Sequence, residues 1–408
     1  MLEQNKKNKR IVVTGLGAIS SIGLGWQEFW KNLVAGKSGI TQVSSFDTSA
    51  YDHHYAGEIK NFKPEQFINR KKMYRLGRSS QMAIAASKLA LEDAGIKLNE
   101  EIRYNTAVCM GTTTGEIGLL EKFNDHPINL DKKKFQDNFV SVFPSNTVSA
   151  SIALEFKLRG PNYVFGTACS SGNFAIARAY DLIRNSKADY AFAGGADSLS
   201  RIIFTGFSRL SAVALEKCQP FDKNRKGMIP GEGAAVLFLE SLESALERRA
   251  KIYAEILGYG LSCDAYHMTN PEVQGIAKAI KKTIENSGVT NDEVDYISAH
   301  GTGTLENDKA ECQAIKIVFG KKSSHIPVSS IKSMLGHSMG AAAAFETIAC
   351  CLVIDKNEIP PTINFEEKDP DCDIDCVPNK GRKHRVKIVL NNSQAFGGNN
   401  ACLVLSKN

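Results

Sequence analysis

The stretch YVFGTACSSGNF, residues 163–174, decides how the rest of the chain is interpreted. A β-prone run gives way to small residues, and a helical pattern begins directly after them. Cys169 therefore falls at a sharp turn from a strand into the N-terminus of a helix. Free backbone N–H groups and the helix dipole stabilise a thiolate there, which predicts a lowered pKa for the Cys169 thiol. We interpret Cys169 as a nucleophile, with an inert core thiol as the alternative.

Short β-prone runs alternate with longer helical patterns on both sides of this turn. Strands are predicted at residues 11–14, 106–110, 190–193, 235–239, 296–299, 326–329, 387–390 and 401–405. Helices are predicted at residues 79–94, 173–185, 273–287, 308–319 and 340–354. This alternation predicts an α/β fold with buried sheets. The last of these helices is apolar on nearly all sides, so we expect it to be sandwiched between two layers.

A charged segment at residues 242–252 separates two strand-rich parts of the chain. We therefore predict an N-terminal half, residues 1–252, which carries the nucleophile, and a C-terminal half, residues 253–408. Candidate residues lie in both halves, so we expect a site between them.

The composition is that of a soluble globular protein. Hydrophobic residues make up 43% of the 408 residues and charged residues 23%, which excludes a disordered or fibrous chain. The 50 basic and 44 acidic residues leave a net charge of +6, too small to predict nucleic-acid binding. No apolar run reaches the roughly 20 residues of a membrane span, so no membrane partner is predicted. The 10 cysteines are scattered without zinc-ligand spacing, which predicts reduced thiols, a cytoplasmic protein and no metal site.

Two loops of the second half carry residues that could act on a thiol. The loop SAHGTGT follows a predicted strand and contains His300, Thr302 and Thr304. The loop SSIKSMLGH follows another strand and brings Lys332 and His337 together around a glycine turn. A lone histidine is usually structural, but two histidines and a lysine that each follow a buried strand indicate a shared site.

Three carboxylates could extend this cluster. Glu346 lies within the apolar helix, where a carboxylate needs a partner, and Lys332 is the candidate. Asp308 and Glu311 could belong to the same polar network, although helix capping is an equal interpretation of Asp308.

The loop NNSQAFGGNN near the C-terminus stands between two predicted strands. Gly397 and Gly398 permit close approach of the backbone. Phe396 could gate a pocket and aim its N–H at an oxyanion, with a plain β-turn as the alternative.

The motifs TACSSG, AHGTGT, SIKSMLGH and AFGG resemble, in order and spacing, the β-ketoacyl-acyl carrier protein synthases of the thiolase fold. The similarity covers nearly the whole chain and includes PFDKNRKGMIPGEGAA and CDAYHMTNP. It implies a five-layered α-β-α-β-α fold built from two similar halves, normally dimeric. It also implies an acyltransferase that holds an acyl group on its cysteine and extends it with malonyl-carrier protein, in fatty-acid or type II polyketide synthesis.

The elongating branch of this family uses a Cys-His-His triad, which implies that Cys169 is the nucleophile and that His300 and His337 stabilise the enolate. The other implied roles are an oxyanion hole from the N–H groups of Cys169 and Phe396, support by Lys332, Glu346, Asp308 and Glu311, and contacts of Thr302 and Thr304 with phosphopantetheine. No permanent cofactor is implied, because the carrier protein brings the phosphopantetheine arm.

Carrier proteins are acidic, so a basic segment of this chain is a candidate docking site. Its residues are Arg70, Lys71, Lys72, Arg75 and Arg78. A solvated helix face is the alternative.

Two departures from the housekeeping fatty-acid enzymes leave the substrate open. Those enzymes typically read GFGG where this chain has Gln394 and Ala395 before Phe396, and the segment 206–220 is shorter here. Acyl length, pathway and the choice of homodimer or heterodimer are therefore open. One alternative is the catalytic ketosynthase of a dedicated type II polyketide or polyene pathway, paired with a homologous chain-length subunit. A non-catalytic carrier-binding partner is the other.

Overall fold

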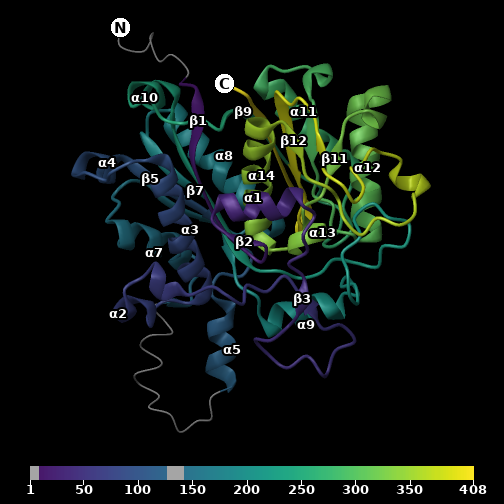
Figure 1. Ribbon diagram of the computed structural model, residues 1–408, viewed down its shortest axis with the longest axis horizontal. Helices are drawn as coiled ribbons and strands as arrows, with labels where there is room; N and C mark the ends of the chain where they lie inside the picture. The colour runs from purple at the N-terminus through teal and green to yellow at the C-terminus, as the bar shows by residue number, and fades with distance from the viewer. Residues whose placement is uncertain (1–8, 126–141) are drawn as a thin grey trace.

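The computed structural model describes residues 9–125 and 142–408 (Figure 1). Within these ranges one long sheet contains most of the strands, in the order β11-β10-β14-β15-β9-β1-β8-β7-β5-β6. Its two ends follow the same plan. The strands of the first half are β1 (Ile11–Ser20), β5 (Thr106–Gly111), β6 (Asn162–Phe165), β7 (Tyr190–Asp197) and β8 (Gly233–Ser241). Those of the second half are β9 (Ala254–Cys263), β10 (Tyr296–Ser298), β11 (Val328–Ser329), β14 (Ile388–Ser393) and β15 (Asn399–Ser406).

The repeat extends to strand order and direction. Numbered within its own half, each set runs 3-2-4-5-1 across the sheet. The third, second and fourth strands pair in parallel, and the fourth, fifth and first pair antiparallel. The halves join where residues 11–13 of β1 pair with residues 254–256 of β9. The described chain therefore contains two halves with the same strand order and strand directions.

Helices form three layers around the two half-sheets (Figure 1). The outer layers are α3 (Arg78–Ala94) with α7 (Thr147–Phe156), and α11 (Val273–Ser287) with α12 (Leu305–Phe319); the middle layer is α8 (Ser171–Arg184) with α14 (Ala342–Lys356). Each helix layer has its own cluster of buried hydrophobic residues. The five-layered arrangement of two similar halves expected from the sequence is confirmed.

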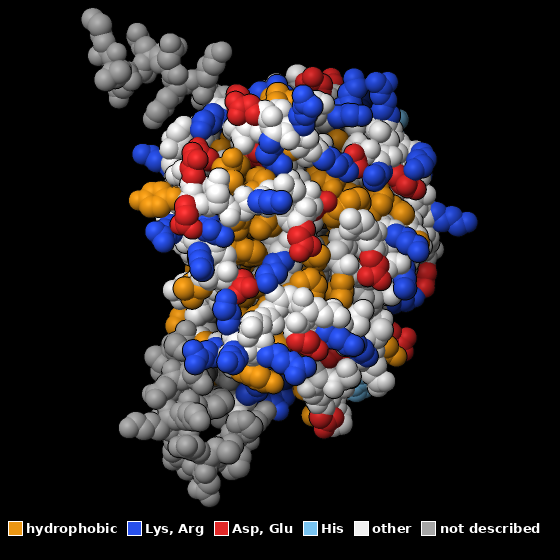
Figure 2. All heavy atoms as spheres, turned by 60° about the vertical axis from the view of Figure 1, so that its left-hand side comes forward, with side chains coloured by type: hydrophobic (Ala, Val, Ile, Leu, Met, Phe, Trp, Pro, Cys, Tyr) orange, Lys and Arg blue, Asp and Glu red, His pale blue; other side chains and the backbone are white. Residues whose placement is uncertain are grey.

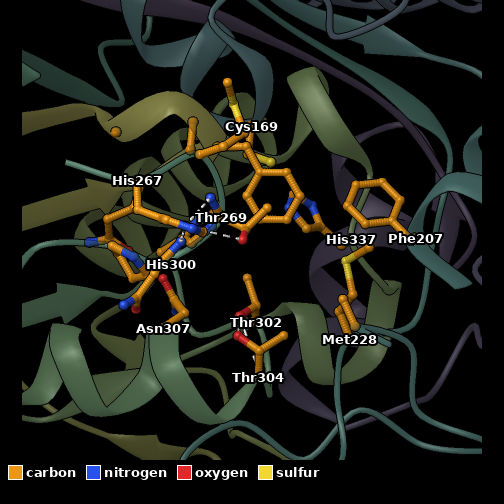
Figure 3. A pocket seen from close by; sticks show the side chains of 18 residues that line it. Cys169, Phe207, Met228, His267, Thr269, His300, Thr302, Thr304, Asn307 and His337 are labelled. Carbon is orange, nitrogen blue, oxygen red and sulfur yellow. Dashed lines mark hydrogen bonds between the residues drawn. The ribbon is translucent and has the colours of Figure 1, made fainter. Parts of the chain in front are cut away.

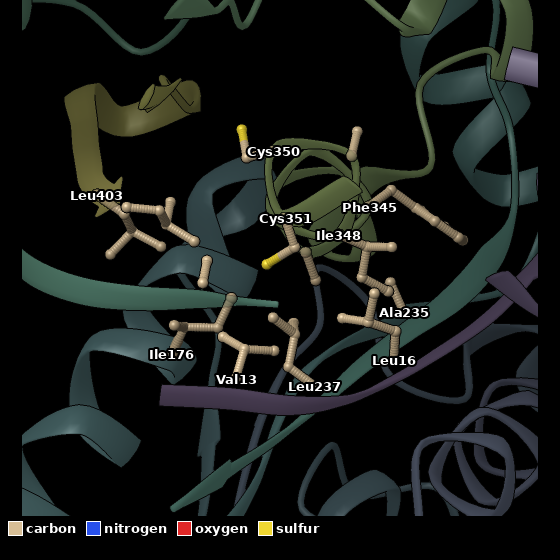
Figure 4. Packing of buried hydrophobic residues seen from close by; sticks show 14 of the residues in the cluster. Val13, Leu16, Ile176, Ala235, Leu237, Phe345, Ile348, Cys350, Cys351 and Leu403 are labelled. Carbon is tan, nitrogen blue, oxygen red and sulfur yellow. The ribbon is translucent and has the colours of Figure 1, made fainter. Parts of the chain in front are cut away.

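The position of α14 confirms that its apolar sequence marks a sandwiched helix. Residues 342–354 are buried on every side. Cys350 and Cys351 point to different sides of the helix, and Cys351 faces the strands of the first half (Figure 4). The neighbouring helix α8 approaches closely at Gly172, where a Cβ would lie only 2.8 Å from the Ala344 nitrogen. A glycine is therefore required at this crossing.

The sequence analysis did not predict β9. Gly258 and Gly260 lower the β propensity of this strand. However, a Cβ at Gly260 would lie 2.4 Å from the carbonyl oxygen of Ala279 on α11. The glycine is needed for helix-to-strand packing, which local propensity does not report.

Shorter elements complete the described chain: β2 (Gly23–Leu24), α1 (Trp26–Val34), β3 (Thr41–Gln42), β4 (Tyr55–Ala56), α2 (Arg70–Met73), α4 (Glu100–Asn105), α5 (Ile117–Asp125), α9 (Arg201–Arg209), α10 (Leu242–Glu247), α13 (Lys332–Leu335), β12 (Glu358–Ile359) and β13 (Arg382–Lys383). Among the helices of the described ranges, none has the length and apolarity to cross a membrane. The division into residues 1–252 and 253–408 stays a prediction; its boundary falls between α10 and β9, where the strand plan starts again.

Candidate active site

Cys169 lies at the start of α8, where the strand-to-helix pattern put it. One turn of 3-10 helix, Ala168–Ser170, leads from β6 into the helix. Ala168 has a φ of 49°, a left-handed conformation that costs a residue with a Cβ about 1 kcal/mol or more. The Ser171 hydroxyl stabilises the turn, because it donates to the Ala168 carbonyl over 2.6 Å and accepts from the Thr167 N–H over 2.9 Å. The strained turn holds Cys169 at the helix N-terminus with 6% of its surface exposed.

His300 follows β10 in a loop that Glu311 holds from α12. The backbone N–H groups of His300 and Gly301 each donate to the Glu311 carboxylate over 2.8 Å. The Asn392 amide adds a bond of 2.7 Å. A fully buried carboxylate is tolerated only with such donors. Glu311 therefore fixes the main chain that carries His300.

Lys332 connects the two loops of the second half. It lies on α13 and is only 2% exposed. Its ammonium group donates to the Glu346 carboxylate, to the carbonyl oxygen of His300 over 2.7 Å and to His300 Nδ1 at 3.3 Å. The expected pairing of Lys332 with Glu346 is present.

His337 follows α13 after a reversal of the chain at Gly336, which has a φ of 72°. Its N–H donates to the Ile229 carbonyl over 2.7 Å, which ties it to the first half. Its ring Nδ1 accepts from the Met339 N–H at 3.2 Å.

The thiol and both imidazoles meet in one buried pocket between the halves (Figure 3). One side-chain atom from each of Cys169, His300 and His337 lies within 4.8 Å of the other two. The imidazole rings stand edge to face with centroids 5.5 Å apart. The structure thus brings together three residues that the sequence places on separate loops.

The hydrogen bonds on the outer ring nitrogens determine where each imidazole carries its proton. An ammonium group and a peptide N–H can only donate, so Nδ1 of His300 and Nδ1 of His337 are both acceptors. In the neutral rings the proton then sits on Nε2. Both histidines therefore present N–H donors to the pocket.

The same hydrogen bonds disfavour a metal ion at this cluster. A thiolate with two imidazoles is a donor set that zinc accepts. However, a metal-bound imidazole normally donates its other N–H to an acceptor. Here Lys332 and the Met339 N–H present donors to that position. The arrangement fits binding of an oxyanion better than binding of a cation.

Burial determines the protonation of the site. It raises the pKa of the Cys169 thiol to about 12, although the charge of Lys332 and the backbone N–H groups of Cys169 and Phe396 act in the opposite direction. The lowered pKa predicted from the helix N-terminus is therefore wrong, because desolvation outweighs these stabilising groups. Burial, with Lys332, holds the pKa of His300 and of His337 well below the usual value. The site contains a neutral thiol and two neutral imidazoles at pH 7.

Aromatic rings narrow the pocket in front of the thiol. The cavity volume is about 60 Å³. Phe207 of α9 and Phe396 of the C-terminal loop both line it, with ring centroids 5.7 Å apart. The gating role considered for Phe396 stays a prediction.

Thr302 and Thr304 line the pocket on the side away from Cys169 (Figure 3), with hydroxyl oxygens 2.8 Å apart. Asp308 braces their loop, because it accepts from the Gly303 N–H over 3.2 Å and the Phe221 N–H over 2.8 Å. The N-cap of α12 is Thr304 and not Asp308, and membership of Asp308 in the polar network of Lys332 and Glu346 stays a prediction.

The sequence analysis missed several residues of the site. Those that line the pocket are Phe207, Met228, His267, Met268, Thr269, Asn270, Pro271 and Asn307. Most of them lie in or next to the stretches that carry the family resemblance, but no chemical reason selected single residues there. Asp197 was missed as well: its buried carboxylate accepts from Thr113 and Gly340 N–H groups over 2.7 Å each. An acidic residue that ends an apolar strand was the available signal.

The basic segment lies on α2, in the turn after it and at the start of α3. Arg70, Lys71, Lys72 and Arg75 are exposed. Arg78 differs, because its guanidinium is bonded twice to the buried Glu232 carboxylate, over 2.6 and 2.8 Å. On the side of the molecule shown in Figure 2, Lys and Arg side chains are interspersed with Asp and Glu side chains. Arg78 therefore forms a structural ion pair with Glu232. Docking by the other basic residues stays a prediction.

Comparisons with known proteins agree with this site. The family model "Beta-ketoacyl synthase, N-terminal domain" matches residues 8–245, and "Beta-ketoacyl synthase, C-terminal domain" matches residues 253–366. The chain is 39% identical to 3-oxoacyl-[acyl-carrier-protein] synthase 2 of Synechocystis sp. (strain ATCC 27184 / PCC 6803 / Kazusa), covering 99% of both chains. It is 38% identical to the protein of that name from Coxiella burnetii (strain RSA 493 / Nine Mile phase I), covering 98% of this chain and 99% of the relative.

Two solved structures resemble the fold closely. The ishigamide ketosynthase/chain length factor matches with a TM-score of 0.94 and 42% identity, covering 98% of this chain and 100% of that one. A type II PKS acyl-carrier protein in complex with its ketosynthase bound to the hexaketide matches with a TM-score of 0.89 and 31% identity, at the same coverage.

Proposed function

The chain belongs to the β-ketoacyl synthase family, and from this premise we propose that it is a 3-oxoacyl-[acyl-carrier-protein] synthase. It joins an acyl group held on Cys169 to a two-carbon unit from malonyl-carrier protein. The observation that carries the proposal is the meeting of one thiol with two imidazole N–H donors in a buried pocket. A thiol supplies the acyl acceptor, and the paired donors suit an enolate oxygen.

In the loading step Cys169 takes the acyl group from a carrier protein. Its sulfur attacks the thioester carbonyl, and the thiol proton ends on the departing pantetheine sulfur, so that the arm leaves as a thiol. The tetrahedral oxygen accepts hydrogen bonds from the N–H groups of Cys169 and Phe396, the two backbone donors that act on the sulfur position. One carbon–sulfur bond forms at Cys169 as the carrier thioester bond breaks.

In the condensation step malonyl-carrier protein loses carbon dioxide. The electron pair of the broken carbon–carbon bond forms an enolate, whose oxygen accepts hydrogen bonds from Nε2–H of His300 and of His337. The enolate carbon then attacks the acyl carbonyl, and the Cys169 thiolate leaves. Neutral imidazoles suit this role, because each already carries an N–H on Nε2 and donates without a change of protonation.

The surrounding residues position these groups. Lys332 holds His300 through its carbonyl and Nδ1 and is neutralised by Glu346. Glu311 and Asp308 hold the loops of His300 and of the two threonines. Thr302 and Thr304 contact the phosphopantetheine arm, which the carrier protein supplies, so no permanent cofactor is proposed.

The acidic carrier protein docks on the exposed residues Arg70, Lys71, Lys72 and Arg75. Positive side chains on α2 raise the local concentration of an acidic partner, and salt weakens such steering. Lys72 is already paired with Glu155 over 2.8 Å, so Arg70, Lys71 and Arg75 contribute most. The reaction takes place in the cytoplasm, where carrier-bound intermediates are made.

A second candidate is the catalytic subunit of a type II polyketide or polyene synthase, paired with a chain-length subunit. The identity of 42% to a ketosynthase/chain length factor structure favours it, as do Gln394 and Ala395 in the gating loop. In either case we expect β6 to form the contact between the two subunits. This strand ends the sheet, pairs with β5 alone among the described strands and carries the partly exposed Tyr163. Native mass spectrometry of the chain purified from its own cells distinguishes two identical chains from a pair with a homologue that lacks the cysteine.

The reaction is tested with purified protein, acyl-carrier protein and malonyl-carrier protein. We expect a 3-oxoacyl product two carbons longer than the donor, and an acyl adduct on the enzyme by intact mass spectrometry. Cys169→Ala should remove the adduct and lower product formation by at least about 10⁴-fold. An adduct that persists in Cys169→Ala would exclude Cys169 as the acyl acceptor.

A further inference from the structure

Gln394 is a polar side chain buried at the active site with half of its amide unpaired. It is 2% exposed and lines the same pocket as Cys169, His300 and His337. Its Nε2 donates to the Glu311 carboxylate at 3.4 Å. Its Oε1 has no donor among the residues of the described ranges.

The carboxylate of Glu311 determines which end of the amide is left over. Glu311 already accepts from the N–H groups of His300 and Gly301 and from the Asn392 amide. A reversed Gln394 amide would place its carbonyl oxygen against this acceptor. The unpaired group is therefore an acceptor, and it lacks a donor.

A buried acceptor without a donor is unfavourable, so its presence calls for a reason. In a pocket that receives a substrate, the substrate can supply the missing donor. A hydrocarbon acyl chain and a malonyl carboxylate carry no hydrogen-bond donor. The pantetheine arm carries an amide N–H two methylene groups from its sulfur, close to the thioester that must reach Cys169.

We propose that Gln394 Oε1 accepts a hydrogen bond from the pantetheine amide nearest the thioester and thereby positions the thioester beside Cys169. This inference rests on the proposed function. Thr302 and Thr304 contact the arm on the side of the pocket away from Cys169, so they do not fill the place beside the thiol (Figure 3). Gln394 is thus a positioning residue for the arm. An apolar side chain at this position would offer the pantetheine amide no hydrogen-bond acceptor.

The test compares two loading substrates that differ in one donor. One is hexanoyl-pantetheine; the other is its analogue with an ester oxygen in place of the amide N–H nearest the sulfur. The rate constant for acylation of Cys169 is measured for each by intact mass spectrometry. A site built around a substrate N–H rejects the analogue that lacks it. We expect wild type to favour the amide by roughly 10-fold, and Gln394→Met to reduce this preference to within about twofold.

The preference is a ratio within one enzyme sample, so a partly folded variant does not distort it. Gln394→Leu provides a second variant, and Asn270→Ala, in the same pocket lining, should keep the wild-type ratio. Equal rates for the two substrates in wild type would overturn the inference, as would a 10-fold preference that survives in both Gln394 variants. If neither substrate acylates wild type, the proposed function itself fails, and the inference fails with it.

Discussion

The two middle helices of the molecule begin with the same turn, yet they contribute different chemistry. α8 starts after a 3-10 turn whose first residue, Ala168, has a φ of 49°. α14 starts after a 3-10 turn whose first residue, Met339, has a φ of 53°. The residue that follows is Cys169 in the first half and Gly340 in the second. The repeated strand order therefore extends to a repeated, strained backbone at equivalent positions.

What lies in front of each turn explains the difference. At Gly340 a Cβ would lie 2.7 Å from the Asp197 carboxylate and equally close to the Thr112 backbone. The Gly340 N–H instead donates to Asp197 over 2.7 Å, which ties the second turn to the first half. The second half delivers its imidazoles from positions before its turn. A fold can thus be repeated without its chemistry, because the space beside an equivalent residue differs.

The largest effect in this comparison is expected on the reaction rate, when the second half loses one of its imidazole N–H donors. His300→Ala and His337→Ala should each slow malonyl decarboxylation by about 100- to 1000-fold, because one enolate donor is lost. Some loading of Cys169 should persist, since the backbone N–H groups remain. Carbon dioxide release and intact mass are the measurements. His267→Ala is the matched control: His267 lines the same pocket but is exposed, and its Nδ1 accepts within its own loop. Equal losses in all three variants would contradict the assignment.

A smaller effect is expected from placing alanine at the equivalent position of each turn. Gly340→Ala should lower the free energy of unfolding by about 1–3 kcal/mol, because its Cβ meets Asp197 and the Thr112 backbone. Cys169→Ala keeps the Cβ and should change stability by less than about 1 kcal/mol. Urea titration of both variants measures the contrast. Similar stabilities would mean that the second turn has room for a side chain after all.

The smallest effect concerns pH. The pKa of His337 is held well below 6.5 by burial, so below pH 6.5 the unfolded chain binds a proton that the folded chain does not. Stability should therefore fall as pH falls below 6.5, by up to about 1.4 kcal/mol per pH unit for this residue. Above pH 6.5 the ring is neutral in both states and contributes no slope.

The variant His337→Asn isolates this contribution. Unfolding free energies of wild type and His337→Asn are measured by urea titration between pH 7.5 and 5.5. The buried carboxyls with a raised pKa, such as Asp197 and Glu311, act in the opposite direction but are common to both proteins. The variant should show the shallower fall with acidification. Parallel curves would mean that His337 takes up a proton in the folded protein.

Much of the fold could be predicted because hydrophobic periodicity is a local property. The buried strands and the all-apolar α14 lie where their patterns placed them, within a few residues. β9 was missed because Gly258 and Gly260 serve a contact with α11 that the strand's own sequence does not reveal. Its ten residues follow directly after the charged segment that marks the boundary between the halves.

The candidate site shows the same division between local and distant information. Cys169, His300, Lys332 and His337 were identified because each follows a buried strand in a loop of small residues. The pKa of Cys169 was predicted in the wrong direction, because the helix start is visible in the sequence and the surrounding burial is not. Phe207 and Asp197 were missed, since an aromatic on a helix and an acid at a strand end have no chemistry until the pocket assembles.

By itself, the amino-acid sequence determined the alternating α/β plan, the family and the residue types available to the reaction, since these depend on patterns within a few turns or strands. Only the tertiary structure decided which of these residues meet, which ring nitrogen carries each proton, and that Arg78 pairs with the buried Glu232. It also left one Gln394 oxygen without a donor. These properties depend on burial and on atoms far apart in the chain, and desolvation and hydrogen bonding act over a few ångströms in space.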